Sequence, residues 1–222
     1  MAEGNRTALL AGATGLVGRE LLRQMAEASH YDRLHVLVRR PVKELSGLDK
    51  VQAHQVDFDA LPALPAVDDV LIALGTTIKA AGSQEAFRRV DYDYVVDVAR
   101  AARAAGAKRL GLVSALGADP KSRAFYNRVK AEAEQAVCEL GYDSVVIAQP
   151  SLLIGDREAL GQPVRRGELV ARRVLGPLSK LIPLAVRPVE ASAVASALLE
   201  HLRTTPKGVE RIASRFMHPH PR

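Results

Sequence analysis

Apolar and polar positions follow two patterns along the chain, short apolar runs and longer amphipathic stretches. Six near-continuous apolar runs predict buried strands, at residues 7–11, 34–38, 50–56, 69–74, 109–114 and 144–148. Apolar residues recur at helical spacing over residues 16–29, 84–105, 123–140 and 190–203. This order predicts an α/β fold, in which a doubly wound parallel sheet is covered by helices on both faces and connected by right-handed crossovers.

The pattern changes at residues 156–188, where glycine, proline and arginine surround short apolar pieces. We expect this small C-terminal region to cover the substrate side of the same domain, because 222 residues fit a single core. The mixture of basic and apolar residues over 165–186 also suits a membrane surface, but the covering role is favoured over peripheral membrane contact. Residues 216–222 are expected to form a flexible tail.

The composition narrows the classes of function. The chain is 48% hydrophobic and carries a net charge of +6, but its arginines cluster only in pairs, without a basic run interleaved with aromatic residues. This arrangement does not favour nucleic acid as a partner. No apolar run reaches the length of a transmembrane helix. The tail histidines, His218 and His220, are too few for a metal site, so no metal is expected.

Cys138 is the only cysteine, which makes an intrachain disulfide impossible and indicates a reducing compartment. We expect a cytoplasmic protein on this basis. The neighbours of Cys138 follow a helical pattern, which favours a packed, unreactive thiol over a nucleophile.

A glycine-rich turn follows the first predicted strand and opens the first helix. Its sequence is Gly12-Ala13-Thr14-Gly15-Leu16-Val17-Gly18. Gly12 permits a tight turn, Gly15 lets the backbone approach a pyrophosphate, and Gly18 allows close packing of helix and strand. The free N–H groups and the positive dipole end of the helix attract phosphates. The motif predicts a Rossmann-type fold with a dinucleotide at residues 12 and 14–18; a turn without a ligand is the alternative.

The residues after the second predicted strand indicate the choice of cofactor. Sites that prefer NAD place an acidic residue there to bind the ribose hydroxyls. This chain has Arg39 and Arg40, and a guanidinium pairs in a bidentate way with a 2′-phosphate. The pair therefore favours NADP(H) over NAD(H), with a solvated arginine pair as the alternative. Asp57 and Phe58 follow the third strand and suit an adenine edge. The segment Leu74, Gly75 and Thr76 would lie beside the ribose of the cofactor.

Three residues form a candidate catalytic set. Tyr126 and Lys130 lie one turn apart on a predicted helix and share a face. Ser114 ends the fifth strand, at the edge where open parallel sheets bind ligands. Serine can orient a substrate oxygen, tyrosine can give or take a proton, and a nearby ammonium lowers the pKa of the phenol. Tyr-x-x-x-Lys occurs by chance in many surface helices, but in this context the set predicts hydride transfer to or from a small carbonyl or alcohol.

The chain resembles the short-chain dehydrogenase/reductase superfamily in its extended or atypical branch. The segments that carry the resemblance are Gly12 to Gly18, Asp57-Phe58, Leu74 to Thr77, Ser114 with Tyr126 and Lys130, and Pro150 to Gly155. It is similar in particular to the Tat-interacting-protein oxidoreductase group and its short bacterial relatives, through residues 73–77, 89–95 and 112–119. The resemblance implies NADPH binding and a triad of Ser114, Tyr126 and Lys130. It also implies that the segment at the nicotinamide is Pro150, Ser151 and Leu152.

Two positions depart from the pattern of the superfamily. Asp91 occupies the helix segment in which conventional members place the asparagine of a proton relay, and Gln149-Pro150 stands where many extended members have Arg-Pro. The resemblance also leaves a second function open, an NADPH-sensing protein whose cofactor state controls a partner. We expect a monomer or a homodimer, because the helices at 84–105 and 123–140 could pair between subunits.

Overall fold

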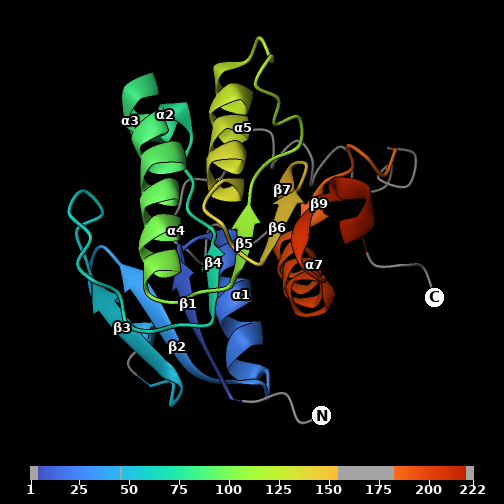
Figure 1. The fold of residues 1–222 in the computed structure, drawn as a ribbon. Coiled ribbons are helices and arrows are strands. Elements are labelled where there is room, and N and C mark those ends of the chain that lie inside the picture. Colours follow the sequence, from blue (N-terminus) through green and yellow to red (C-terminus); the bar gives the residue numbers. More distant parts are fainter. Residues whose placement is uncertain (1–4, 46, 155–182, 219–222) are drawn as a thin grey trace.

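A single parallel sheet organises the chain (Figure 1). The computed structural model describes residues 5–45, 47–154 and 183–218. The strands of this sheet are β1 (Arg6–Ala11), β2 (Tyr31–Val38), β3 (Val51–Gln55), β4 (Asp69–Ile72), β5 (Arg109–Val113), β6 (Ser144–Gln149) and β9 (Gly208–Ala213). Their order is β3-β2-β1-β4-β5-β6-β9, and every neighbouring pair is parallel. The doubly wound parallel sheet predicted from the sequence is therefore confirmed.

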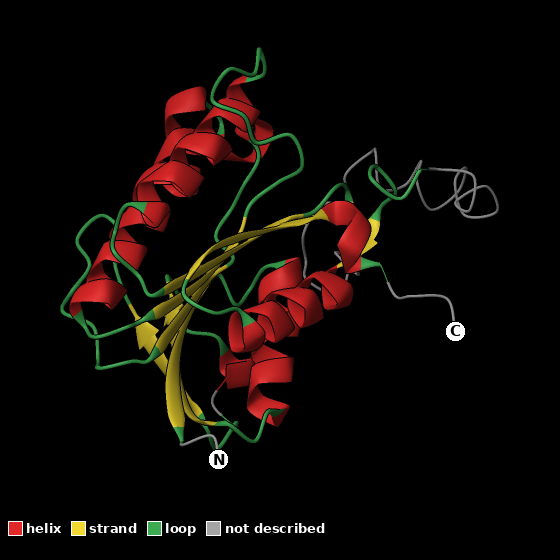
Figure 2. Cartoon of the chain, turned by 45° about the vertical axis from the view of Figure 1, so that its right-hand side comes forward, coloured by secondary structure: helices red, strands yellow, loops and turns green. Residues whose placement is uncertain are grey.

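Helices cover both faces of the sheet (Figure 2). The helical elements are α1 (Leu16–Glu27), η1 (Lys43–Leu45), α2 (Ile78–Ala81), α3 (Gln84–Arg88), η2 (Arg89–Asp93), α4 (Tyr94–Ala104), α5 (Phe125–Cys138), α7 (Ala191–Thr204) and η4 (Ser214–Met217). The long helices α4 and α5 lie on one face, and α1 and α7 on the other. A short parallel pair, β7 (Leu153–Ile154) and β8 (Val189–Glu190), lies apart from the main sheet.

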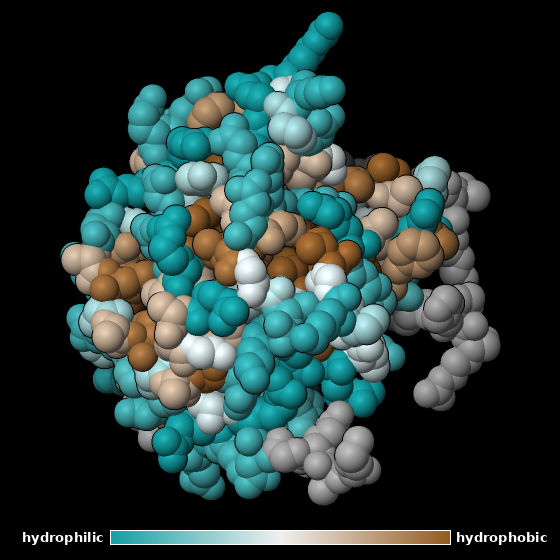
Figure 3. Space-filling view, in the orientation of Figure 1, coloured by the Kyte–Doolittle hydropathy of each residue, from teal (hydrophilic) through white to brown (hydrophobic). Residues whose placement is uncertain are grey.

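The two helical layers explain the continuous apolar runs of the strands. Ala8 and Leu10 of β1 pack in the core beneath α1 and α7. Leu9 and Ala11 pack in the core beneath α4 and α5. Because both faces of the sheet are covered, most residues of the central strands are buried, and most of these are apolar. In the view of Figure 3, apolar side chains form a band across the middle of the molecule, with hydrophilic side chains above and below it.

The sheet reverses its winding direction between β1 and β4. β2 and β3 follow on one side of β1, whereas β4, β5 and β6 follow on the other. The loops that leave the carboxyl ends of β1 and β4 therefore part in opposite directions, and ligands of doubly wound folds bind in the crevice between them. The glycine turn follows β1 and residues 73–77 follow β4. Both predicted cofactor segments thus lie at the point of reversal.

The helix predicted at 84–105 contains a π-helical turn. The segments α3, η2 and α4 follow one another without a break, and η2 (Arg89–Asp93) is the π-helical part. Turns of this kind occur frequently at functional sites, because the extra residue changes the direction of the side chains. Asp91 lies in this turn and is fully buried.

The strand β9 was not predicted from the sequence. It pairs with β6 along its whole length, from Ser144 opposite Gly208 to Gln149 opposite Ala213. β9 lies at the edge of the sheet, and most of its residues are at least partly exposed. A half-exposed edge strand with charged residues lacks the apolar run that identifies the buried strands.

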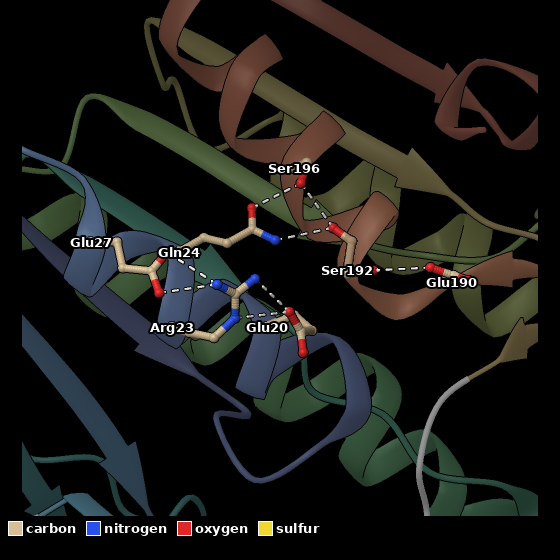
Figure 4. Close-up of polar contacts among 7 residues, drawn as sticks. All are labelled: Glu20, Arg23, Gln24, Glu27, Glu190, Ser192 and Ser196. Atoms are coloured by element: carbon tan, nitrogen blue, oxygen red, sulfur yellow. Dashed lines mark hydrogen bonds and ion pairs between the residues drawn. The ribbon is translucent and has the colours of Figure 1, made fainter. Parts of the chain in front are cut away.

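Polar contacts join α7 to α1, the helix that opens at the glycine turn (Figure 4). The Gln24 amide nitrogen donates to the backbone oxygen of Ser192 at 3.1 Å, and the Ser196 hydroxyl donates to the Gln24 oxygen at 3.0 Å. On the exposed side of α1, Arg23 forms ion pairs with Glu20 and Glu27. The C-terminal helix therefore supports the position of α1.

A buried carboxylate joins four strands of the sheet at their amino ends, away from the glycine turn. Asp69 accepts hydrogen bonds from the guanidinium groups of Arg6 and Arg109, through both oxygens in each case. The Tyr31 hydroxyl also donates to Asp69, at 2.8 Å. Burial and the charge of Asp69 raise the pKa of Tyr31, so this tyrosine remains a donor. These contacts tie β1, β2, β4 and β5 together at the amino ends of the strands.

Three of the segments discussed from the sequence lie partly or mostly outside the described residues. The segment 156–188 lies mostly outside the described residues, as does most of 165–186. Of the tail expected over residues 216–222, the structure places Phe216 and Met217 in η4, where Met217 is only 2% exposed and packs in the core, and residues 219–222 lie outside the described residues. Among the described helices, none combines the length and apolar character needed to cross a membrane. The described residues also contain no cluster of side chains suited to a metal ion.

Candidate cofactor and active site

Two glycines of the turn are required by the fold itself. Gly12 has a φ of +95°, and a Cβ there would lie 2.5 Å from the backbone of Ala73. A Cβ at Gly18 would lie 2.0 Å from the backbone oxygen of Gly12. Because no side chain fits at those distances, both positions need glycine whether or not a ligand binds.

Gly15 differs from these two glycines. Its φ of −84° is open to any residue, and the nearest atom to an added Cβ is the Gly12 oxygen at an ordinary 3.4 Å. The fold therefore leaves space at Gly15 that a side chain would fill. Gly15 is also the N-cap of α1, without a side-chain cap and without an acidic residue in the first turn. Free N–H groups beside an open space fit an anionic diphosphate.

The other predicted residues of the turn take different positions. Thr14 is exposed, whereas the side chains of Leu16 and Val17 are buried in the core beneath α1. Only the backbone N–H groups of Leu16 and Val17 are therefore suited to a ligand.

A pocket of about 540 Å³ lies beside the carboxyl ends of β2 and β3. Its lining consists of Arg39, Gln55, Val56, Asp57, Phe58, Asp59 and Tyr94. The structure thus brings Arg39 together with Asp57 and Phe58, as the cofactor prediction requires. Arg40 is exposed beside Arg39 and does not belong to this lining.

Tyr94 and Asp59 complete this pocket, and the sequence analysis did not identify them. The Tyr94 ring lies 5.5 Å from the ring of Phe58, and its hydroxyl donates to Asp59 at 2.8 Å. Arg89 donates to the same carboxylate oxygen at 2.6 Å. The hydrogen bond from Tyr94 and the charge of Arg89 lower the pKa of Asp59 despite some desolvation. Asp59 therefore connects the loop after β3 to the π-helical turn.

Lys130 lies at the centre of a buried ion pair. Its ammonium is 2.7 Å from Asp91 Oδ1, and the other oxygen of Asp91 accepts a hydrogen bond from the Thr76 N–H at 2.9 Å. Burial is the largest single effect on Lys130 and lowers its pKa, but Asp91, Tyr126 and Glu134 together outweigh burial, so the pKa of Lys130 is raised. A Cβ at Gly75 would lie 3.3 Å from Asp91 Oδ1, so this turn passes closely over the pair. The structure joins Gly75, Thr76 and Lys130 through Asp91.

Tyr126 lies in the first turn of α5, one turn before Lys130 on the same face. It is half-buried, and its ring lies 5.3 Å from the ring of Phe87 in α3. The phenol of Tyr126 also acts on Lys130, where it favours the ammonium form. α5 therefore places Tyr126 and Lys130 one turn apart on the same face, and their catalytic pairing stays a prediction.

Ser114 follows β5 and is buried. Its backbone N–H donates to the Ala148 oxygen of β6, and its hydroxyl donates to Glu134 at 2.5 Å. The sequence analysis did not identify Glu134. The available signal was its position on α5, one turn beyond Lys130 on the face that carries Tyr126.

The segment after β6 is held by three neighbouring segments. The Leu116 N–H donates to the Pro150 oxygen at 2.8 Å, which links the exits of β5 and β6. The Ser151 N–H donates to the Ser214 hydroxyl at 3.1 Å, and the Ser151 hydroxyl donates to the Arg187 oxygen. Leu152 is exposed at this edge. The position of Pro150 to Leu152 is thus fixed by the backbone of the fold.

Solved structures confirm the fold. An oxidoreductase of the short-chain dehydrogenase/reductase family from Burkholderia thailandensis matches 96% of this chain and 92% of its own, with a TM-score of 0.68 and 21% identity. MoeE5 in complex with UDP-glucose and NAD matches 93% of this chain and 76% of its own, with a TM-score of 0.70 and 17% identity. At these identities the likeness concerns the fold alone.

Curated relatives correct the expected location. Protein FMP52 of Eremothecium gossypii is 34% identical over 86% of this chain and 87% of its own length, and it is named as mitochondrial. The FMP52 proteins of Emericella nidulans and Debaryomyces hansenii carry the same name. The cytoplasmic prediction is therefore wrong as stated. A lone cysteine excludes an intrachain disulfide, but it does not distinguish one reducing compartment from another.

Family relationships agree with the site geometry. The model of an NAD(P)H-binding family matches residues 12–172, which include the glycine turn and the proposed catalytic residues. Protein HTATIP2 of Rattus norvegicus is 35% identical over 78% of this chain and 72% of its own length. The resemblance to the Tat-interacting-protein group is thereby confirmed. The chain belongs to the NAD(P)H-binding family that includes HTATIP2 and FMP52, and it has the fold of NAD(P)-dependent oxidoreductases.

Proposed function

We propose that this protein is an NADP(H)-dependent oxidoreductase of the short-chain dehydrogenase/reductase type, acting on a small carbonyl or alcohol. The observation that carries the proposal is the buried Lys130 ammonium, held by Asp91 one helical turn from Tyr126. A buried ion pair is costly to form, and a fixed charge beside a tyrosine has a direct chemical use. The proposed catalytic residues are Ser114, Tyr126 and Lys130.

The cofactor would be held along the reversal point of the sheet. The residues proposed for the diphosphate are Gly12, Thr14, Gly15, Leu16, Val17 and Gly18. Arg39, with Arg40 beside it, would bind the 2′-phosphate, and Asp57 and Phe58 would contact the adenine. The ribose and nicotinamide would lie along Leu74 to Thr76, Lys130 and Pro150 to Leu152. The space over Gly15 and the shared pocket of Arg39, Asp57 and Phe58 support this assignment.

The chemistry of the site follows from the charge of Lys130. When bound, the nicotinamide supplies or accepts the hydride. The Lys130 ammonium would attract the negative charge that develops on the Tyr126 oxygen as its proton leaves. Tyr126 Oη then gives its proton to the substrate oxygen in reduction and takes it back in oxidation. Asp91 keeps the ammonium in place beneath Gly75.

The proposal is tested by NADPH oxidation with a panel of small aldehydes and ketones. The wild-type protein and Tyr126→Phe are compared, because the phenylalanine removes only the reacting hydroxyl. We expect a rate loss of about 10²-fold or more, the usual contribution of an acid–base group. The dissociation constant of NADPH, measured by calorimetry, should stay within about twofold. Equal rates in the two proteins would overturn the triad, and tight NADPH binding without turnover of any carbonyl would favour the cofactor-sensing function instead.

A further inference from the structure

A buried carboxylate lies against the serine of the proposed triad. Glu134 of α5 is 3% exposed, and its Oε1 lies 2.5 Å from the Ser114 hydroxyl oxygen. The Gln149 amide nitrogen donates to both carboxylate oxygens, at 2.9 and 3.1 Å. Arg211 of β9 donates to Oε2 at 3.2 Å. The end of β5, the end of β6 and the edge strand thus converge on Glu134.

These contacts assign the proton between Ser114 and Glu134. Both oxygens of Glu134 accept hydrogen bonds from N–H groups, and neither the amide nitrogen of Gln149 nor the guanidinium of Arg211 can accept one. The geometry has the hydroxyl of Ser114 as the donor and the carboxylate of Glu134, held by Gln149 and Arg211, as the acceptor. Hydrogen bonds to an ionised acceptor are about twice as strong as neutral ones, so this proton is held firmly.

The direction of this hydrogen bond determines what Ser114 can offer to a ligand. A serine hydroxyl has one proton and two lone pairs. With the proton directed to Glu134, only the lone pairs remain for other partners. A carbonyl oxygen is also only an acceptor, so it cannot form a hydrogen bond with Ser114 in this state. Donation to a carbonyl substrate would come from Tyr126.

We propose that Glu134 is a positioning residue, which holds the hydroxyl proton of Ser114 and so makes Ser114 a hydrogen-bond acceptor in the substrate site. Ligand groups that donate, a hydroxyl or an N–H, are then favoured at Ser114 over a carbonyl. The role explains one departure from the superfamily pattern, because Gln149 supplies the amide that orients Glu134. Its consequence for turnover rests on the proposed oxidoreductase function, whereas the proton assignment does not.

A thiol at position 114 reports on the charge of Glu134 without any substrate. The test protein is Ser114→Cys with Cys138→Ala, which leaves one cysteine in the chain. Its thiol pKa is measured from thiolate absorbance as the pH is raised. A carboxylate that holds the thiol proton disfavours the thiolate, so we expect a pKa well above the usual value of about 8.5. Adding Glu134→Gln should lower this pKa by at least about one unit, because the nearby negative charge is removed.

A matched control uses the same substitution at a half-buried position of α5. Glu132 lies two residues away on this helix and pairs with Arg88 rather than with Ser114. Glu132→Gln should leave the thiol pKa unchanged within about 0.3 units, while both variants keep their melting temperatures close to that of the parent. An unchanged thiol pKa in the folded Glu134→Gln protein would overturn the proposal.

The consequence for turnover is measured with any carbonyl that the wild-type protein reduces. Glu134→Gln weakens the hold on the serine proton, so Ser114 can donate to the carbonyl and KM should fall by about threefold to tenfold. In a Ser114→Ala background the same substitution should leave KM unchanged, because the two residues act as a pair. An equal change in both backgrounds would contradict action through Ser114. If the wild-type protein reduces no carbonyl, the proposed function fails, but the thiol measurement still decides the role of Glu134.

Discussion

Asp91 provides a sharp test of the ion pair at the centre of the site. The change is Asp91→Asn, which keeps the shape of the side chain and removes its charge. Two unit charges 2.7 Å apart attract by about 6 kcal/mol at an effective dielectric constant of about 20. The desolvation of both groups offsets part of this attraction, and removing one member of a buried pair usually costs about 3–5 kcal/mol. We expect a loss of that size in the free energy of unfolding at pH 7.

The pH dependence of stability below pH 10.5 should also change. In the wild type the pKa of Lys130 is raised above its ordinary 10.5, because Asp91, with smaller effects of Tyr126 and Glu134, more than offsets burial. Its contribution to stability is then complete below pH 10.5 and is lost as the pH rises through the folded-state pKa. In Asp91→Asn the opposing effect of burial remains, so the folded-state pKa falls below 10.5. Stability should therefore increase as the pH is raised toward 10.5, by at most about 1.4 kcal/mol per unit.

Urea unfolding at pH 7, 8, 9 and 10 measures both effects. Glu134, the other carboxylate that favours the Lys130 ammonium, is the same in both proteins. Asp97→Asn is the control, because Asp97 forms an exposed pair with Arg100 and such pairs contribute no more than about 1 kcal/mol. A loss below about 1 kcal/mol in Asp91→Asn, or the same dependence of stability on pH in Asp91→Asn as in the wild type, would contradict the stabilising role of this ion pair.

Three further sets of substitutions test the pocket at Arg39, the glycine turn and the buried histidine. Arg39→Ala should raise the dissociation constant of NADPH about tenfold or more and leave that of NADH unchanged, with Arg33→Ala at the exposed start of β2 as the control in calorimetry. Gly15→Ala should keep the melting temperature and weaken NADPH binding, whereas Gly18→Ala should prevent folding, because its Cβ meets the backbone at 2.0 Å. Burial and the neighbouring His54 lower the pKa of His35. Its contribution to stability is therefore present above pH 6.5 and is lost as the pH falls below that value. Scanning calorimetry from pH 7 to 5 should record a falling melting temperature, and His35→Gln should reduce this fall.

The predictable parts of the site were those that depend on local sequence. The glycine turn follows directly from its spacing, and Tyr126 and Lys130 are linked by one turn of a helix. Their chemistry could be anticipated because the carboxyl ends of parallel strands share one edge. The continuous apolar strands were found for a similar reason, since burial on both faces leaves a pattern in the sequence itself.

The other parts depend on contacts between distant segments. Glu134 meets Ser114 only because β5 and α5 are brought together, and its spacing on the helix alone did not indicate a partner. Asp91 was noticed as a departure, but its contact with Lys130 depends on the π-helical turn. The strand β9 was missed because one edge of the sheet is partly exposed, so charged residues interrupt its pattern. These features follow from packing rather than from local propensity.

The proposed function requires hydride transfer from the bound cofactor to a carbonyl, with Tyr126 as the proton donor. Its most direct test uses NADPH with deuterium at the transferable C4 position, incubated with the carbonyl panel and analysed by mass spectrometry. We expect one deuterium on the former carbonyl carbon of the product alcohol with the wild-type protein, and a yield lower by about 10²-fold with Tyr126→Phe. Saturating NADPH binding without deuterium in any product would contradict the proposed function.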